Sequence, residues 1–153
     1  MFLKLFLDGL ELQLKIDNYN SNDNEWAKTS LFLKFQNIIN YELDNKEMLL
    51  CSEIDELRDC LYKLINNEYS EIEELEFEEP DLEFNLYPSN EILDISMDLQ
   101  INLWDNGLTC NNISTTFSKT DIEALYYYLL LVTNKIDKDS ENIQKLIKDG
   151  VIY

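Results

Sequence analysis

The chain of 153 residues contains no histidine, three glycines and two prolines. Histidine is the side chain that most often serves as a general base or activates a nucleophile near neutral pH. The few glycines form neither a glycine-rich phosphate-binding loop nor a dinucleotide-binding fingerprint. Histidine-dependent catalysis and nucleotide binding through such loops are therefore excluded, and the composition favours a binding protein over an enzyme.

Metal-binding and catalytic spacings are missing as well. With 31 acidic residues, some carboxylates must lie close together whether or not they act as a catalytic pair. The acidic residues lack the spacing of a calcium loop, and Cys51, Cys60 and Cys110 are not spaced as zinc ligands. We therefore predict no enzyme activity, no cofactor and no metal site, and we expect the cysteines to be reduced core residues.

Long apolar segments are also absent. No apolar run approaches the roughly 18 residues that a membrane-spanning helix needs. The first twelve residues are apolar, but they alternate with polar ones, include Asp8 and lack a small-residue cleavage site. We expect a strand at this position rather than a signal peptide, and a cytoplasmic protein.

Basic residues are missing from a long central segment. Between Leu64 and Ser118 there is no Lys or Arg, whereas 13 of the residues are acidic and the whole chain has a net charge of −19. Such a surface would repel a phosphate backbone or an anionic membrane, so we predict no direct binding to nucleic acid or membrane. A basic protein is the partner that fits, unless the charge serves only solubility.

The same segment carries a clear strand pattern. Leu75 and Phe77 alternate with glutamates, and the alternation resumes from Leu82 to Leu86. Period-two alternation is typical of half-buried strands, so we predict two strands, joined at residues 79–81, with a carboxylate-covered outer face. We predict that a protein partner binds to this face. The predicted partner-binding residues are Glu74, Glu76, Glu78, Glu83, Asp94 and Asp98.

Other strands follow from the same alternation. Asp8-Gly9 and Asp105-Asn106-Gly107 are strong hairpin signals, and residues 44–47 are predicted to form a turn. The longest pattern, residues 93–103, is expected to lie centrally in its sheet. The further predicted strands cover residues 3–7, 10–16, 31–35, 39–43, 93–103 and 109–117.

Apolar residues at helical spacing predict three helices. The first covers residues 53–66 with Ser52 as its N-cap. The second covers residues 121–134 behind a capping box formed by Thr120 and Glu123. A short third helix covers residues 140–149 and stops at Gly150.

The predicted fold class is α+β: mainly antiparallel β-sheet, about eight strands in two meanders, with two main helices and a short C-terminal helix. Residues 1–134 are expected to form a single domain, and residues 135–153 a C-terminal helical extension. That extension holds four of the twelve basic residues, and it either docks on acidic surface or mediates self-association. Trp26, Trp104 and the tyrosines at 126–128 are expected to pack against the protein rather than to contact a partner.

Several short sequence motifs follow one another in a characteristic order along residues 1–134. The most specific is the pattern Glu-Phe-x-Glu-Pro-x-Leu-x-Phe, which begins at Glu76. The others are Gly9–Leu12, Asn24–Trp26, Met48–Leu50 leading into Glu53-Ile54 and Leu57, the strand ending at Trp104, and the helix starting Asp121-Ile122. This order resembles the WapI-type immunity proteins, which are cytoplasmic antidotes of bacterial polymorphic and contact-delivered toxins. The resemblance implies a non-catalytic protein that binds and blocks a toxin, and it implies no defined site residues.

Two features depart from that family. The segment after Trp26 lacks a Trp-rich, Gly-containing middle, and residues 135–153 look like an addition.

Three functional hypotheses remain open from the sequence. The first is an immunity protein that binds and neutralises a cognate bacterial toxin domain, a nuclease, through its acidic surface. The second is a phage-encoded acidic mimic of nucleic acid that inhibits a host defence nuclease. The third is an acidic scaffold or regulatory protein with no nuclease partner.

Overall fold

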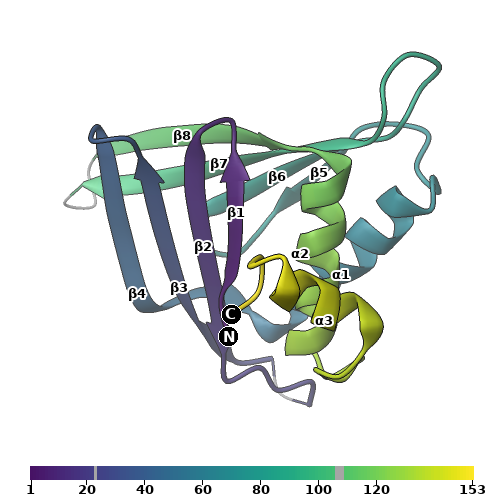
Figure 1. The fold of residues 1–153 in the computed structure, drawn as a ribbon. Coiled ribbons are helices and arrows are strands. Elements are labelled where there is room, and N and C mark those ends of the chain that lie inside the picture. The colour runs from purple at the N-terminus through teal and green to yellow at the C-terminus, as the bar shows by residue number, and fades with distance from the viewer. Residues whose placement is uncertain (23, 106–108) are drawn as a thin grey trace.

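The computed structural model describes residues 1–22, 24–105 and 109–153, without the side chains of residues 104, 105, 109 and 110. The described residues form two four-stranded antiparallel sheets and three helices (Figure 1), which confirms the predicted α+β class. Sheet A consists of β1 (Leu3–Leu7), β2 (Leu10–Asp17), β3 (Trp26–Phe35) and β4 (Ile39–Leu50). Sheet B consists of β5 (Glu73–Glu76), β6 (Leu82–Tyr87), β7 (Ser96–Asp105) and β8 (Thr109–Phe117). The helices are α1 (Cys51–Ile65), α2 (Lys119–Val132) and α3 (Glu141–Lys148).

Sheet A begins with the predicted hairpin. Asp8 and Gly9 both have positive φ angles, 49° and 88°, as a tight two-residue hairpin turn requires. The turn places Leu5 opposite Leu12 and Leu7 opposite Leu10, so the apolar residues of both strands face the core. The turn residues and the alternation of apolar with polar residues therefore specify the same pairing of β1 with β2.

The second half of sheet A differs from the prediction. The third strand starts at Trp26 rather than at residue 31, and β4 continues through the predicted turn at 44–47. The pairing of β3 with β4 shifts between Thr29 and Leu31, next to Ser30. The Ser30 hydroxyl donates to Asp44 Oδ1 at 2.8 Å and accepts the Asn45 N–H at 3.0 Å. These hydrogen bonds satisfy polar groups of Ser30, Asp44 and Asn45 within an irregular strand pair. The chain therefore does not reverse at residues 44–47, and β4 continues.

The predicted starts of the first two helices were each wrong by two residues. The N-cap of α1 is Leu50 rather than Ser52, whose hydroxyl instead donates to Asn24 Oδ1 at 2.5 Å. The capping box of α2 is formed by Ser118 and Asp121, not by Thr120 and Glu123. Both helices follow directly on a strand, β4 or β8, and the end of the strand decides which residue lies at the cap.

The start of β7 was also predicted wrongly. This strand begins at Ser96, which pairs with Tyr87, and not at Leu93. Leu93 belongs to a loop in which the Asn90 side chain accepts the N–H groups of Ile92 and Leu93, both at 2.9 Å. The central position of β7 is confirmed, because it pairs with β6 and with β8. The predicted turn at 105–107 lies partly outside the described residues.

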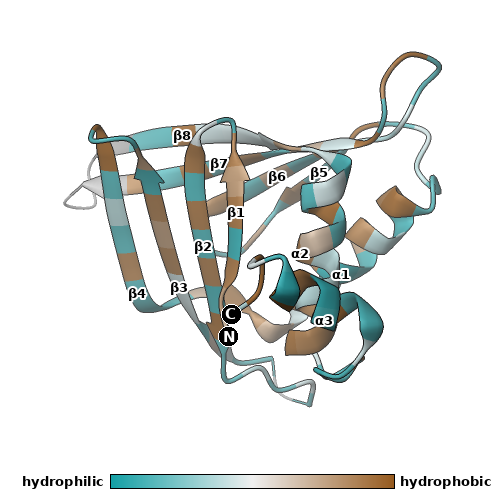
Figure 2. Ribbon diagram, viewed as in Figure 1, coloured by the Kyte–Doolittle hydropathy of each residue, from teal (hydrophilic) through white to brown (hydrophobic). Residues whose placement is uncertain are grey.

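One hydrophobic core joins both sheets and the helices. The sheets face one another with their strands crossing steeply, and α1 and α2 close one end of the space between them (Figure 1). Figure 2 shows apolar residues recurring along the strands of both sheets and along the helices. The side chains that meet at the centre are Leu3, Leu12, Leu14, Ile16, Leu31, Leu49, Ile54, Leu57, Leu82, Phe84, Leu99, Phe117, Leu125 and Leu129. None of the helices in the described part of the chain is long and apolar enough to span a membrane.

The C-terminal segment docks on β1 of the same chain. The Lys4 N–H donates to the Val151 carbonyl at 2.7 Å, and Phe2 and Tyr153 exchange two backbone hydrogen bonds. Ile143 of α3 and Ile152 are fully buried. None of the lysines beyond residue 134 forms an ion pair with the described residues, so the docking depends on backbone pairing and apolar packing. It also covers the edge of β1, which would otherwise present unpaired backbone groups. A domain boundary at residue 134 stays a prediction.

Most residues that we expected to pack lie in or against the core. Tyr128 is buried, Tyr126 and Tyr127 are half-buried against the core, and Trp26 is half-buried at the start of β3. Cys51 is a buried free thiol and Cys60 a half-buried one. The side chains of Trp104 and Cys110 lie outside the described residues.

Tyr128 ties α2 to sheet A, and its removal should be measurable. Its hydroxyl accepts the Ile16 N–H at 3.0 Å and donates to the Met1 carbonyl at 3.2 Å. Tyr128→Phe leaves a buried donor without its acceptor, so we expect the free energy of unfolding at pH 7 to fall by about 1–2 kcal/mol. Tyr153→Phe, at an exposed hydroxyl, should change it by less than about 0.5 kcal/mol.

The same variant should alter the stability at high pH. Burial raises the pKa of the Tyr128 phenol above its ordinary value. A raised folded-state pKa contributes stability that is present below the unfolded tyrosine pKa of about 10 and is lost as the pH rises above it. Urea unfolding from pH 9 to 11 should therefore show a smaller loss for Tyr128→Phe than for the unmodified protein. Equal losses of stability in the two proteins would mean that the pKa of Tyr128 is the same in the folded and the unfolded state.

The candidate partner-binding surface

The outer face of sheet B is built by the pleat of its strands. Leu75, Phe84 and Leu99 point into the core, so their neighbours in sequence point to solvent. The register aligns these outward residues into rows across the sheet. One row is Glu76, Glu83, Gln100 and Ser114, and the next is Glu74, Asn85, Asp98 and Thr116. In these two rows β5 presents two carboxylates, β6 and β7 each present one carboxylate and one amide, and β8 presents two hydroxyl groups.

The structure brings four of the six predicted residues together on this face. They are Glu74, Glu76, Glu83 and Asp98, and we call them the acidic face. The other two lie outside the strands: Glu78 follows the end of β5, and Asp94 precedes β7. Both are exposed to solvent. The strand pattern predicted the first four positions, but it did not predict that Glu78 and Asp94 would fall in loops.

Two members of the acidic face are held by neighbouring side chains. Glu83 accepts hydrogen bonds from Asn102 Nδ2 at 2.7 Å and from Gln100 Nε2 at 3.2 Å. Asp98 accepts one from the Thr116 hydroxyl at 2.7 Å. Burial and a hydrogen bond to Asp98 raise the pKa of Tyr87, which lies beside it. These contacts fix both carboxylates in place on the sheet.

The other two members have no such support. The carboxylates of Glu74 and Glu76 make no hydrogen bond or ion pair within the described residues, and both are exposed. Glu76 lies directly opposite Glu83 across the strand pair. Like charges in this arrangement destabilise a sheet by a few tenths to about 1 kcal/mol. The fold therefore keeps a repulsive pair where a neutral residue would be more stable.

Asp94 is the only one of the six with a cation nearby in the described part of the chain. Lys119, the first residue of α2, places its ammonium 3.7 Å from Asp94 Oδ2. Both side chains are about half exposed, so the pair contributes little to stability. Lys119 directly follows the base-free segment in sequence, but it lies 25 residues from Asp94, and only the fold brings the two side chains together.

The Glu53 side chain holds the segment that follows β5 against the start of α1. This side chain is 7% exposed, and its carboxylate accepts two backbone N–H groups, from Leu50 at 2.7 Å and from Glu78 at 2.5 Å. One side chain thereby caps α1 and holds the segment that follows β5. The sequence suggested only a favourable acid in the first helical turn, because the contact with Glu78 spans 25 residues.

Replacing Glu53 by alanine should destabilise the protein more than a neighbouring substitution does. Glu53→Ala leaves two backbone donors without their acceptor, and we expect the free energy of unfolding to fall by about 2–3 kcal/mol. Glu56→Ala, at an exposed position of the same helix, should cost less than about 0.5 kcal/mol. Chemical denaturation of both variants measures the difference. Equal losses of unfolding free energy would contradict a stabilising contact between α1 and the segment that follows β5.

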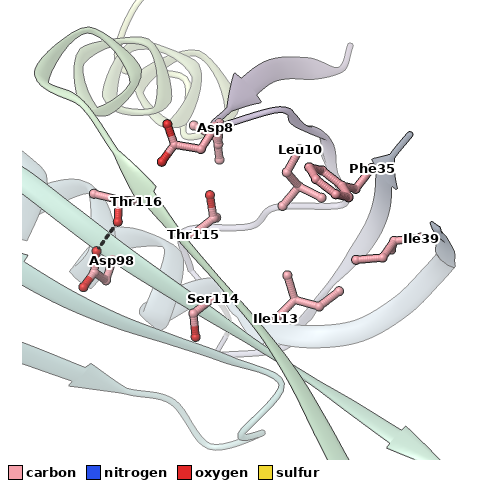
Figure 3. Close-up of a pocket in the computed structure, with 10 residues that line it drawn as sticks. Asp8, Leu10, Phe35, Ile39, Asp98, Ile113, Ser114, Thr115 and Thr116 are labelled. Carbon is pink, nitrogen blue, oxygen red and sulfur yellow. Dashed lines mark hydrogen bonds between the residues drawn. The ribbon is translucent and has the colours of Figure 1, made fainter. Parts of the chain in front are cut away.

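An open cleft lies between β8 and the β1–β2 turn (Figure 3). Its volume is about 360 Å³, and Leu10, Phe35 and Ile39 from sheet A form its apolar wall. The opposite side carries Ser114, Thr115 and Thr116 of β8. The sequence did not reveal the cleft, because it depends on the approach of two separate sheets.

Comparison with protein families identifies a match over most of this chain. The model of the immunity protein WapI-like family matches residues 3–135. A search of the curated proteins gives no match. The matched region includes both sheets, α1 and α2, contains the acidic strand pair and ends before α3. Because the match extends over far more than half of the sequence, the chain belongs to the immunity protein WapI-like family.

Proposed function

We propose that this immunity protein binds and neutralises a cognate toxin domain through the acidic face of sheet B, and that the toxin is a nuclease. The observation that carries the proposal is the gathering of Glu74, Glu76, Glu83 and Asp98 on one side of a paired sheet. The strands of sheet B contain no Lys or Arg at all. An immunity protein must bind its toxin, and this face offers four carboxylates without a basic residue among the strands.

The charge of the face suggests the kind of toxin. A nuclease binds the phosphate backbone through Lys and Arg side chains, so its substrate groove is positively charged. The carboxylates stand on neighbouring strands, which lie about 4.8 Å apart, and they offer that groove a set of closely spaced negative charges. Opposite fields of this kind raise association rates and favour the matching partner.

Family membership favours a toxin antidote over a phage-borne mimic of nucleic acid. Inhibition by occupation of the groove needs no catalysis by the immunity protein. We place the complex in the cytoplasm, where the nucleic acid that the toxin would attack is found.

The test is a tagged pull-down from the source cells at low and at high salt, read by mass spectrometry. We expect recovery of the basic toxin domain of a large secreted protein at low salt, and much less of it at high salt. The recovered domain should degrade DNA or RNA, and the immunity protein should stop this. Recovery of a host defence nuclease would support the mimic instead. A toxin domain without nuclease activity would refute the nuclease assignment alone.

A further inference from the structure

The loop between β6 and β7 exposes large apolar side chains to solvent. Ile92 is 90% exposed and Leu93 is 65% exposed. Ile72, in the connection between α1 and β5, is 57% exposed. The loop extends beyond sheet B (Figure 1), and Figure 2 shows apolar residues on it. Single exposed apolar residues are common, but a cluster rimmed by polar residues marks an interaction site.

Local hydrogen bonds hold this loop in one conformation. The Asn90 side chain accepts the N–H groups of Ile92 and Leu93, and the Asn90 N–H donates to the Leu93 carbonyl at 2.9 Å. The Ser89 hydroxyl donates to Asn67 Oδ1 at 2.6 Å, which ties the loop to the end of α1. A partner that binds Ile92 and Leu93 therefore meets a preorganised surface and loses little entropy in ordering it.

The exposed cluster adjoins the acidic face. Ile72 and Leu93 line a hollow of about 320 Å³ together with Tyr87 and Asp94. Tyr87 lies on β6 beside β7, which carries Asp98 of the acidic face, and burial together with the charge of Asp98 raises the pKa of the Tyr87 phenol. Glu71 also lines the hollow, and the exposed Glu91 precedes Ile92 in the loop. The cluster and the acidic face thus form one continuous surface with an apolar end.

We infer that Ile72, Ile92 and Leu93, which we call the apolar anchor, insert into an apolar pocket of the toxin that is surrounded by Lys and Arg. This inference rests on the proposed function and adds the part of the interface that salt does not weaken. The carboxylates around the anchor select a basic partner. A second copy of this chain would bring an equal net charge of −19 and the same carboxylates against itself.

The anchor and the acidic face should make separable contributions. Charge pairs at the rim of an interface raise the association rate and weaken with salt. Apolar anchors that are buried in a partner's pocket slow dissociation and respond little to salt. Binding at low salt therefore depends on both parts, whereas the binding that remains at high salt depends on the anchor.

The experiment titrates the toxin domain recovered by the pull-down with three forms of the immunity protein, at low and at high salt. The forms are the unmodified protein, Ile92→Ser with Leu93→Ser, and the control Ile38→Ser. Ile38 is 75% exposed in the β3–β4 turn, far in sequence from the anchor. We expect the anchor variant to bind about 10- to 100-fold more weakly at both salt concentrations, and the control to bind as before. Circular dichroism and melting should be unchanged, because the replaced side chains are exposed.

Several results would overturn the inference. Unchanged affinity of the anchor variant would exclude the anchor, and the proposed function would stand if charge reversal on the acidic face still weakened binding. Self-association of the unmodified protein that is lost in the anchor variant would show that a second copy covers the cluster. Failure of the unmodified protein to bind any toxin would refute the proposed function and the inference together.

Discussion

Reversal of Glu74 and Glu76 to lysine should weaken toxin binding by about 10- to 100-fold at low salt and by much less at high salt. The double substitution changes the local charge by four units at the two carboxylates that have no hydrogen-bond or ion-pair partner in the described part of the chain. The loss should appear mainly as slower association, because charges at the rim steer the encounter. Surface plasmon resonance at several salt concentrations measures both the loss and its salt dependence.

The same substitution should leave the fold intact and slightly raise its stability. Glu76→Lys converts the like-charged pair with Glu83 into an attractive pair, which is worth a few tenths to about 1 kcal/mol. An interface residue whose replacement stabilises the free protein is the pattern expected where function opposes stability. Thermal unfolding of the single and double variants measures this gain.

A matched control separates the acidic face from net charge alone. Glu25→Lys with Glu42→Lys changes the net charge equally at exposed positions beside and within sheet A. We expect the control to keep most of the affinity. Equal losses in the two double variants would mean that only the overall charge attracts the toxin, and that the acidic face is not the contact surface.

Truncation of Phe117 to alanine should cost about 3–5 kcal/mol of the free energy of unfolding. Phe117 is the last residue of β8 and is almost completely buried. Its ring lies in the core with Leu31 of sheet A, Ile54 of α1 and Leu125 of α2, so a cavity at this point loosens both sheets and both helices. Domains of this size have total stabilities of about 5–15 kcal/mol, so the variant should be close to unfolding at 37 °C.

Phe6→Ala is the matched control for this prediction. Phe6 lies on β1 but is 66% exposed, and its ring contacts the Lys4 ammonium at 5.0 Å. We expect its truncation to cost less than about 1 kcal/mol. Urea denaturation of both variants gives the comparison, and a small cost for Phe117→Ala would contradict one continuous core between the sheets.

The local sequence by itself determined the type of most elements. Asp8-Gly9 specified a hairpin because both residues accept positive φ, and the alternation of Leu12 with its polar neighbours then set which face is buried. The same period-two pattern placed Glu74, Glu76, Glu83 and Asp98 on one outer face. These features depend on chain geometry over a few residues, and the pattern records them directly.

Only the tertiary structure decided where elements end and what lies beside them. Ser30 kept β4 paired through a predicted turn, and Asn90 held Leu93 out of β7, so an expected core residue became part of an exposed cluster. Glu53 reached Glu78, and Lys119 came to lie near Asp94, through contacts across 25 residues in each case. Residues 151–153 pair with the edge of β1, although the two segments are separated by almost the whole length of the sequence. Such contacts satisfy particular backbone and charged groups whose partners lie far along the chain, and no local pattern encodes which partner the fold will bring near.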